Sequence, residues 1–197
     1  MRRETSGKPQ SLTLNKMTIE ILTICGSLRS GSSNAKLIEA YSRCAPSGLT
    51  FTRLDTIGDL PIYNPDIDED PLPSAVIEAR SIVRSAELLI FSTPEYIHSL
   101  PAALKNLLEW LVGDPDFYGK KALILHANSS SQFALSELRE VLSTMSAQIL
   151  DQACVVVDLG SNKTTVDEIL QNEDIKSSLV RSSEVMIQTF NKPNQSE

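Results

Sequence analysis

Hydrophobic and polar positions follow two alternating patterns along the chain. Short apolar runs alternate with segments in which apolar side chains recur every three or four residues. The runs have the length of buried strands, and the periodic segments have the single apolar face of a helix. The runs predict strands at residues 18–25, 49–55, 87–93, 121–127 and 152–159. The periodic segments predict helices at residues 33–44, 74–85, 100–111, 136–145 and 165–190.

A regular alternation of strands and helices is typical of parallel sheets, because each crossover between parallel strands needs a connection about as long as a helix. The sequence therefore predicts an α/β fold of three layers: one doubly wound, five-stranded parallel sheet with helices on both faces. One domain is expected over residues 17–191. Residues 1–16 are polar and are predicted to form a disordered tail, and residues 192–197 a flexible one.

Composition narrows the class of partner. The chain has 197 residues and a formal net charge of −7, which disfavours binding to nucleic-acid phosphates. Three scattered cysteines without a CxxC pair indicate a reducing cytoplasmic location, with Cys25 and Cys154 as small buried side chains. No run approaches the ~18 apolar residues of a membrane span. The acidic residues at 66–70 lack the glycine and the terminal glutamate of a calcium loop, so no metal is expected.

Two loops carry candidate chemistry, because ligands of such folds bind beyond the carboxyl ends of the strands. The first, GSLRSGSSN at residues 26–34, leads from a strand into a helix start. Free N–H groups there, hydroxyl side chains and the charge of Arg29 favour a phosphate, although a loop that merely caps the helix is the alternative. The second, residues 93–101, is stiffened by Pro94 and Pro101 and presents Tyr96, whose backbone could support a flat ring.

Three motifs in order resemble the NADPH-dependent FMN reductase family, flavoproteins of flavodoxin-like fold that include quinone, azo-dye and chromate reductases. GSLRSGSSN is similar to the family's GSxRxxSxN, and LPIYNPD at residues 60–66 to LPxYxxD. PEYIHSLPAALKNLLEWL at residues 94–111 is similar to PEYNxSxPxxLKNAIDWxS. Together with the element order, the resemblance covers residues 17–160.

The resemblance implies an FMN-dependent NAD(P)H oxidoreductase that passes hydride from NADPH or NADH to a quinone-like or other small electron acceptor. Because the flavin N5 carries the hydride, no catalytic side chain is required. The chain is expected to form a homodimer or homotetramer. The implied residues are, for the FMN phosphate, Ser27, Arg29, Ser33 and Asn34; for the flavin ring, Pro94, Glu95, Tyr96, Ile97 and His98, with Asn128 and Ser129 of the third loop; and for the substrate, Tyr63, Asn64 and His98.

Two departures from the family pattern alter the ring end of the expected site. Ile97-His98 stands where relatives usually carry Asn-Gly, and residues 126–132 lack the usual glycines. His98 either faces solvent or lies over the flavin edge as a modulator of substrate access. These departures support one alternative, a flavin-binding regulatory protein. A flavodoxin-like electron carrier is the other alternative, although its phosphate loop would be expected to read T/S-x-T-G-x-T. On the following helix, Trp110 is expected in the core or an interface, and Lys105, Asn106 and Glu109 on a solvated face.

Overall fold

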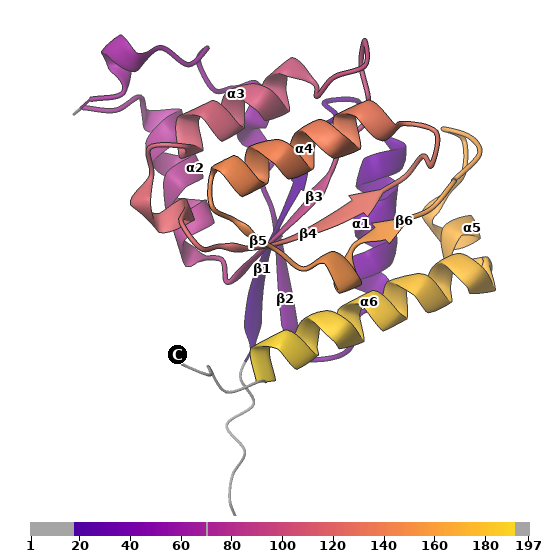
Figure 1. Cartoon of the computed structure of the whole chain (residues 1–197). Coiled ribbons are helices and arrows are strands. Elements are labelled where there is room, and N and C mark those ends of the chain that lie inside the picture. Colours follow the sequence, from indigo (N-terminus) through magenta and orange to yellow (C-terminus); the bar gives the residue numbers. More distant parts are fainter. Residues whose placement is uncertain (1–17, 70, 192–197) are drawn as a thin grey trace, which may run out of the picture.

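A twisted parallel sheet forms the centre of the protein in a computed structural model, which describes residues 18–69 and 71–191 (Figure 1). Its strand order is β2-β1-β3-β4-β5, with β6 pairing with the far end of β4. The strands are β1 (Ile19–Cys25), β2 (Leu49–Arg53), β3 (Leu88–Ser92), β4 (Lys121–His126), β5 (Gln148–Ile149) and β6 (Val155–Val156). The two tails expected at residues 1–16 and 192–197 lie outside the described residues.

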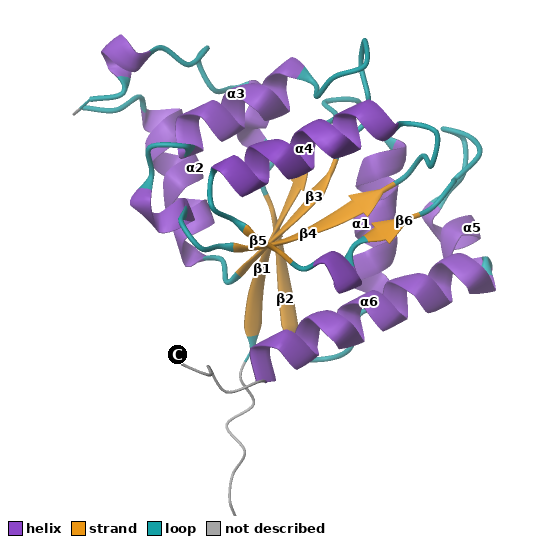
Figure 2. Cartoon of the chain, in the orientation of Figure 1, coloured by secondary structure: helices purple, strands orange, loops and turns teal. Residues whose placement is uncertain are grey.

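Helices cover both faces of the sheet, which confirms the predicted three-layer α/β fold (Figure 2). Three of them pack on one face: α2 (Ser74–Ser85), α3 (Ala102–Leu111) and α4 (Gln132–Thr144). The other face is covered by α1 (Ser33–Cys44), α5 (Val166–Gln171) and α6 (Glu173–Asn191). The bounds of α1 and α2 agree with the predicted ones.

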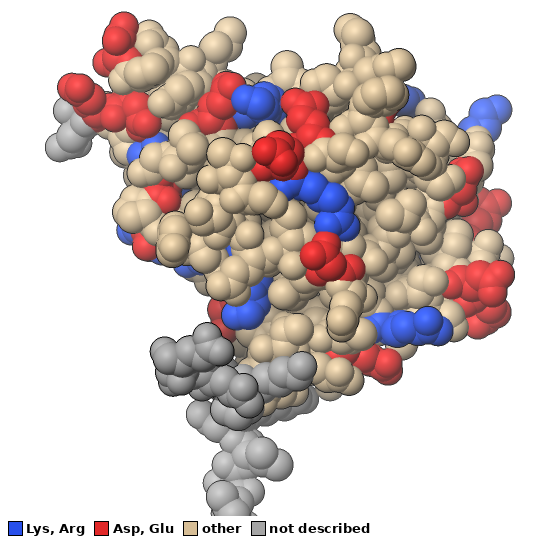
Figure 3. Space-filling view, in the orientation of Figure 1, with Lys and Arg blue, Asp and Glu red and all other residues tan. Residues whose placement is uncertain are grey.

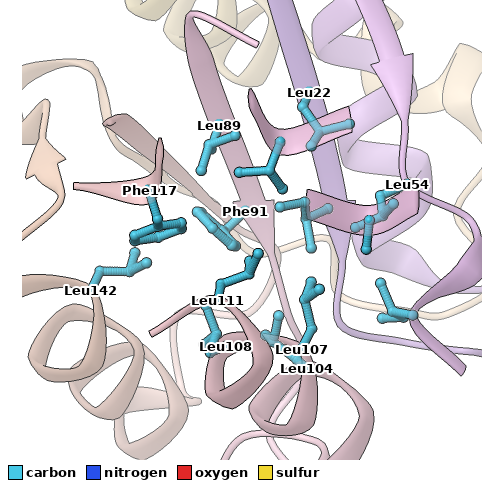
Figure 4. Close-up of a cluster of buried hydrophobic side chains, with 14 of the residues drawn as sticks. Leu22, Leu54, Leu89, Phe91, Leu104, Leu107, Leu108, Leu111, Phe117 and Leu142 are labelled. Atoms are coloured by element: carbon cyan, nitrogen blue, oxygen red, sulfur yellow. The ribbon is translucent and has the colours of Figure 1, made fainter. Parts of the chain in front are cut away.

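Two hydrophobic clusters, one on each face, follow from the alternation of side chains along the strands. Leu89 and Phe91 of β3 pack against Leu107 and Leu111 of α3 (Figure 4), whereas Leu88 and Ile90 belong to the opposite cluster. Trp110 is buried as predicted, and its Nε1 donates to the carbonyl of Pro61 at 2.8 Å. Cys25 is buried, and Cys154 is half-buried.

The predicted fifth strand at residues 152–159 is confirmed only in part, because a turn occupies its first residues. The chain first pairs with the start of β4 as β5, then forms a 3₁₀ turn at Asp151–Ala153, and pairs again as β6. The apolar run that predicted a strand contributes only Val155–Val156. An edge strand has one neighbour, so a turn can interrupt it without breaking a ladder on the other side. Ser182 of α6 donates to the carbonyl of Ala153 at this turn.

The predicted closing helix at residues 165–190 is two helices. Asn172 has extended backbone angles and separates α5 from α6. Its Oδ1 accepts a hydrogen bond from the N–H of Ile175 at 3.2 Å, which is the capping contact of a new helix start. Asparagine followed by Glu173 and Asp174 is a sequence signal for such a start.

Candidate functional site

A cavity of about 470 Å³ opens at the carboxyl edge of the sheet, a size usual for small-molecule sites. β1 connects to β2 on one side and pairs with β3 on the other, so the strand order reverses between β1 and β3, where ligands of open α/β sheets bind. Loops after β1, β3, β4 and β6 line the cavity. The lining residues are Ser33, Asn34, Thr93, Pro94, Glu95, His126, Ala127, Asn128, Ser130, Ser131, Asp158, Leu159, Gly160, Ser161 and Asn162.

The first loop begins in very close contact with the loop after β3. The N–H of Gly26 donates to the carbonyl of Ser92 at 2.8 Å. A Cβ atom at Gly26 would lie 2.3 Å from Oγ1 of Thr93, well inside van der Waals contact. Glycine is therefore required at residue 26 by the approach of the two loops rather than by its backbone angles.

Several polar side chains of the first loop hold the loop itself in shape. Ser27 Oγ accepts from the N–H of Arg29 at 3.3 Å, and Ser32 Oγ caps α1 by accepting from Ala35. Asn34 Oδ1 accepts from the hydroxyl of buried Ser92 at 2.9 Å. Of the predicted phosphate residues, Ser33 and Asn34 line the cavity. Ser27 is buried and Arg29 is exposed, and neither is part of the lining.

Backbone N–H groups, by contrast, remain available at this loop. The N–H groups of Ser30, Gly31 and Ser33 make no hydrogen bond to any described residue. They lie at the amino end of the twelve-residue helix α1, where the helix dipole also favours an anion. The arrangement supports anion binding mainly through the backbone.

Sequence reasoning missed the segment at residues 158–162, which lines the cavity opposite the first loop. Ser33 Oγ donates to Asn162 Oδ1 at 2.9 Å, and Lys36 Nζ donates to the carbonyls of Asn162 and Thr164 at 2.8 and 2.9 Å. These bonds tie the segment to α1. The sequence did contain a signal for this segment, because it directly follows the last apolar run. Residues that follow a strand of a parallel sheet lie at the carboxyl edge, where ligands bind.

The second loop forms a two-residue hairpin turn at Ile97-His98. Tyr96 and Ser99 exchange backbone hydrogen bonds of 3.0 and 3.1 Å, and φ is +53° at Ile97 and +57° at His98. Positive φ at both central residues defines a type I′ turn, for which Asn-Gly is the preferred pair. A β-branched residue such as Ile97 is strained in this region. The departure from Asn-Gly therefore matters for backbone strain, rather than for the approach of a ring.

Helix α4 holds this turn in place from the side. Glu95 Oε2 accepts from the N–H of Ala134 at 3.0 Å, and Glu137 Oε2 accepts from Ser99 Oγ and from the N–H of Leu100. The His98 ring stacks on Phe133, with centroids 4.5 Å apart and planes 9° apart. Pro94 and Glu95 line the cavity, whereas Tyr96, Ile97 and His98 are exposed outside its lining.

The predicted substrate residues Tyr63 and Asn64 also lie outside the cavity lining. The N–H of Tyr63 donates to Asn106 Oδ1 at 2.7 Å, and its ring packs edge-on against Trp110. Asn64 caps a 3₁₀ turn by accepting from the N–H of Asp66. The expectation that Asn106 belongs to a solvated face is wrong, because its amide fixes this loop on α3.

Lys105 and Glu109, expected on the same solvated face, are half-exposed. They form an ion pair of 2.7 Å along the helix.

The third loop contributes one predicted residue to the cavity, Asn128, whose Oδ1 accepts from the N–H of Ser130. Ser129 is not part of the lining, and Ser130 and Ser131 are. The loop also brings in His126, which the sequence predictions had not assigned to the site. It is 1% exposed, and the backbones of Ser131 and Asn128 lie against its ring. The sequence signal that could have assigned it to the site is a histidine near the end of an apolar run that predicts a strand.

The charge of the cavity is unfavourable for an anion except at the helix start. Its charged lining residues are the carboxylates Glu95 and Asp158, and no Lys or Arg lines it within the described ranges. Acidic and basic side chains are interspersed over the face shown in Figure 3. Across residues 18–69 and 71–191, no helix is both long and apolar enough to cross a membrane, and no cluster of three or more His, Cys, Asp or Glu is placed to hold a metal.

A parallel sheet of this order with a cavity at the β1/β3 reversal defines a flavodoxin-like protein, the class in which FMN binds at that reversal. Solved structures share the fold. A flavoenzyme NAD(P)H:(acceptor) oxidoreductase from Paracoccus denitrificans superposes with a TM-score of 0.70 at 23% identity, covering 86% of this chain and 98% of that one. A flavodoxin, WrbA-like protein from Agrobacterium tumefaciens gives a TM-score of 0.58 at 14% identity, covering 89% and 99%.

Sequence comparison places the chain in one family of this class. The model of the NADPH-dependent FMN reductase family matches residues 19–162. An NAD(P)H-dependent FMN reductase of Pseudomonas aeruginosa is 35% identical over 150 residues, which cover 73% of this chain and 80% of the relative. A quinone reductase of Escherichia coli is 31% identical over 143 residues, covering 68% and 74%. The chain belongs to the NADPH-dependent FMN reductase family. The predicted fold, family, enzyme class and FMN cofactor are confirmed.

The residues of the cavity fit FMN. Its volume is in the small-molecule range, and the available amides at the start of α1 suit a phosphate better than the carboxylates elsewhere in the lining do.

Proposed function

We propose that this protein uses the cavity at the β1/β3 reversal to hold FMN, and that it transfers hydride from NADPH or NADH to a quinone-like or other small oxidant. The observation that carries the proposal is that the cavity lies at the start of α1, where Ser33 lines it and has an available N–H, in a chain of the FMN reductase family. The three free cysteines and the nicotinamide donor support a cytoplasmic location.

The two ends of the cavity have different roles in this proposal. The amides of the first loop bind the phosphate, together with Arg29 and the hydroxyl of Ser33, while Ser27 shapes the loop and Asn34 keeps it against β3 through Ser92. Residues 94–98 flank the ring from the second loop, and Asn128 and Ser129 from the third. Bound FMN supplies the hydride-accepting and hydride-donating N5 atom. The protein therefore needs to orient the two substrates and exclude water, and it needs no acid–base side chain.

A direct experiment tests the proposed activity. The purified protein, saturated with FMN, is expected to be yellow, to bleach under anaerobic NADPH or NADH, and to regain its colour when a quinone is added. The spectrum of the bound flavin follows both half-reactions. A protein that binds FMN and is not bleached by either nicotinamide contradicts the enzymatic proposal and favours an electron carrier or a regulatory protein.

Arg29→Ala is expected to weaken FMN binding about tenfold to a hundredfold. Arg29 is the one full positive charge of the first loop, and hydrogen bonds to charged groups contribute about 1.5–3 kcal/mol. Titration of the flavin-free protein with FMN measures the change. Arg181→Ala, an exposed position on α6, removes the same charge at another surface and is the matched control. Equal affinities of the two variants would remove Arg29 from the site.

A homodimer is part of the proposal, with Tyr63 and Asn64 of one subunit lining the substrate side of the other. Exposed apolar side chains next to the cavity-lining residues support it: Ile97 is 100% exposed, Phe133 57% and Tyr96 45%. Light scattering is expected to show a dimer or tetramer at micromolar concentration. A fully active monomer would contradict this part of the proposal.

A further inference from the structure

Asn162 is an exposed residue of the cavity lining to which the proposed contacts with FMN give no role. It lies in the segment after β6, and hydrogen bonds to α1 fix its backbone. Lys36 Nζ donates to the carbonyls of Asn162 and Thr164 at 2.8 and 2.9 Å. Lys36 belongs to the first turn of α1, so Asn162 is held against the amino end of that helix, where the phosphate of FMN is proposed to bind.

The side chain of Asn162 contacts Ser33, the first residue of α1. Ser33 Oγ donates to Asn162 Oδ1 at 2.9 Å, and both residues line the cavity. The hydroxyl of Ser33 is also one of the groups proposed to bind the phosphate. A hydroxyl has one hydrogen to donate, and a phosphate dianion offers only acceptors. Ser33 therefore cannot donate to Oδ1 of Asn162 and to a phosphate at the same time.

The amide of Asn162 can remove this competition, because it carries an acceptor oxygen and a donor nitrogen at the same end of the side chain. Its Nδ2 makes no hydrogen bond to a residue of the described ranges, and the side chain is exposed, so burial does not hold the amide in one orientation. The last torsion of an asparagine side chain is broad. After a half-turn about it, Nδ2 donates to Ser33 Oγ, and the hydroxyl hydrogen of Ser33 is free to point at the phosphate.

We propose that Asn162 is a positioning residue of the FMN site, whose amide accepts from Ser33 in the flavin-free protein and donates to Ser33 Oγ once the hydroxyl of Ser33 donates to the phosphate. Hydrogen bonds in a chain polarise one another, so a hydroxyl that accepts from an amide is the better donor. Lys36 keeps the amide within reach of Ser33 in both states. The inference rests on the proposed function, since the phosphate is that of FMN.

Asn162→Asp tests the proposal, because a carboxylate has the shape of the amide and only accepts. It holds the hydroxyl hydrogen of Ser33 and adds a negative charge beside the phosphate. FMN is expected to bind about tenfold more weakly, or worse. Riboflavin has the ring and ribityl chain of FMN without the phosphate, so its affinity is expected to stay within about twofold of wild type. Titration of the flavin-free protein with each flavin measures both affinities.

Asn172→Asp is the matched control for the change of charge. Asn172 is exposed, lies outside the cavity lining and accepts from the N–H of Ile175 through Oδ1, a contact that a carboxylate keeps. The substitution therefore makes the same exchange of an amide for a carboxylate at a remote position. Its affinities for FMN and riboflavin are expected to equal those of the wild type.

A double-mutant cycle tests whether Asn162 acts through Ser33. Asn162→Ala removes the donor without adding charge and is expected to weaken FMN binding about fivefold, the usual effect of one hydrogen bond. In a Ser33→Ala background the same substitution is expected to have no effect, because no hydroxyl is left to orient. A purely structural role of Asn162 would make the two losses additive and would lower riboflavin affinity as well.

Three results overturn the inference. They are a loss of FMN affinity below about fivefold in Asn162→Asp, an equal loss of riboflavin and FMN affinity in that variant, and additive losses in the cycle with Ser33→Ala. Each of them leaves the proposed function standing if the wild type binds FMN and is bleached by a nicotinamide. Failure of the wild type to bind FMN overturns the inference and the proposed function together.

Discussion

Gly26→Ala is expected to destabilise the protein by about 3 kcal/mol, the upper part of the usual range for forcing an extra methyl group into a packed region. The new Cβ would lie 2.3 Å from Thr93 Oγ1, 2.9 Å from Thr93 Cβ and 3.0 Å from Leu104 Cδ2. Thr93 and Leu104 are themselves buried, so neither can move into solvent. The first loop and the loop after β3 would have to separate, which also opens the cavity.

Urea unfolding measures this effect as a lower transition midpoint at constant slope. Gly31→Ala is the matched control in the same loop, because a Cβ atom there meets nothing within 4 Å, and its stability is expected within about 0.5 kcal/mol of wild type. Adding Thr93→Ala to Gly26→Ala removes the 2.3 Å contact and should restore part of the loss. Equal midpoints for the two single glycine variants would show that the loops do not approach as described.

Replacing the turn pair, Ile97→Asn together with His98→Gly, is expected to stabilise the protein by about 2 kcal/mol. Each non-glycine residue with positive φ costs about 1–3 kcal/mol, and Ile97 is both β-branched and completely exposed, so it offsets none of this cost by burial. Part of the gain is lost with the stacking of His98 on Phe133, which contributes about 0.5–1.5 kcal/mol.

The melting temperature of the flavin-free protein is expected to rise by about 4–8 °C for the double variant. The two single variants divide the gain, with Ile97→Asn giving the larger share because it keeps the His98–Phe133 stack. Phe133→Ala removes the stack without changing the turn and is expected to lower the melting temperature slightly. A double variant that melts at or below the wild-type temperature would mean that the turn is not strained.

Some residues of the site could be predicted from the sequence, and the positions of others could not. Ser33, Asn34, Pro94 and Glu95 were predicted and line the cavity, because residues directly after the strands must lie at the carboxyl edge of the sheet. Tyr63 lies elsewhere because Asn106, 43 positions away, holds its loop on α3. Likewise, α4 begins at Gln132, four residues before its predicted start, where Glu95 satisfies the N–H of Ala134 across 39 positions.

The sequence by itself determined the order and type of most elements of this protein and the family to which it belongs. Periodicity and capping act over a few residues, which is why α1 and α2 begin and end where they were predicted to. Only the tertiary structure decided how the last strand divides into β5 and β6, that Asn162 accepts from Ser33 beside the cavity across 129 positions, and that His126 is buried at the end of β4. Hydrogen-bond satisfaction and close packing depend on residues that are near in space and distant in the chain. A local sequence pattern carries no information about which residues those are.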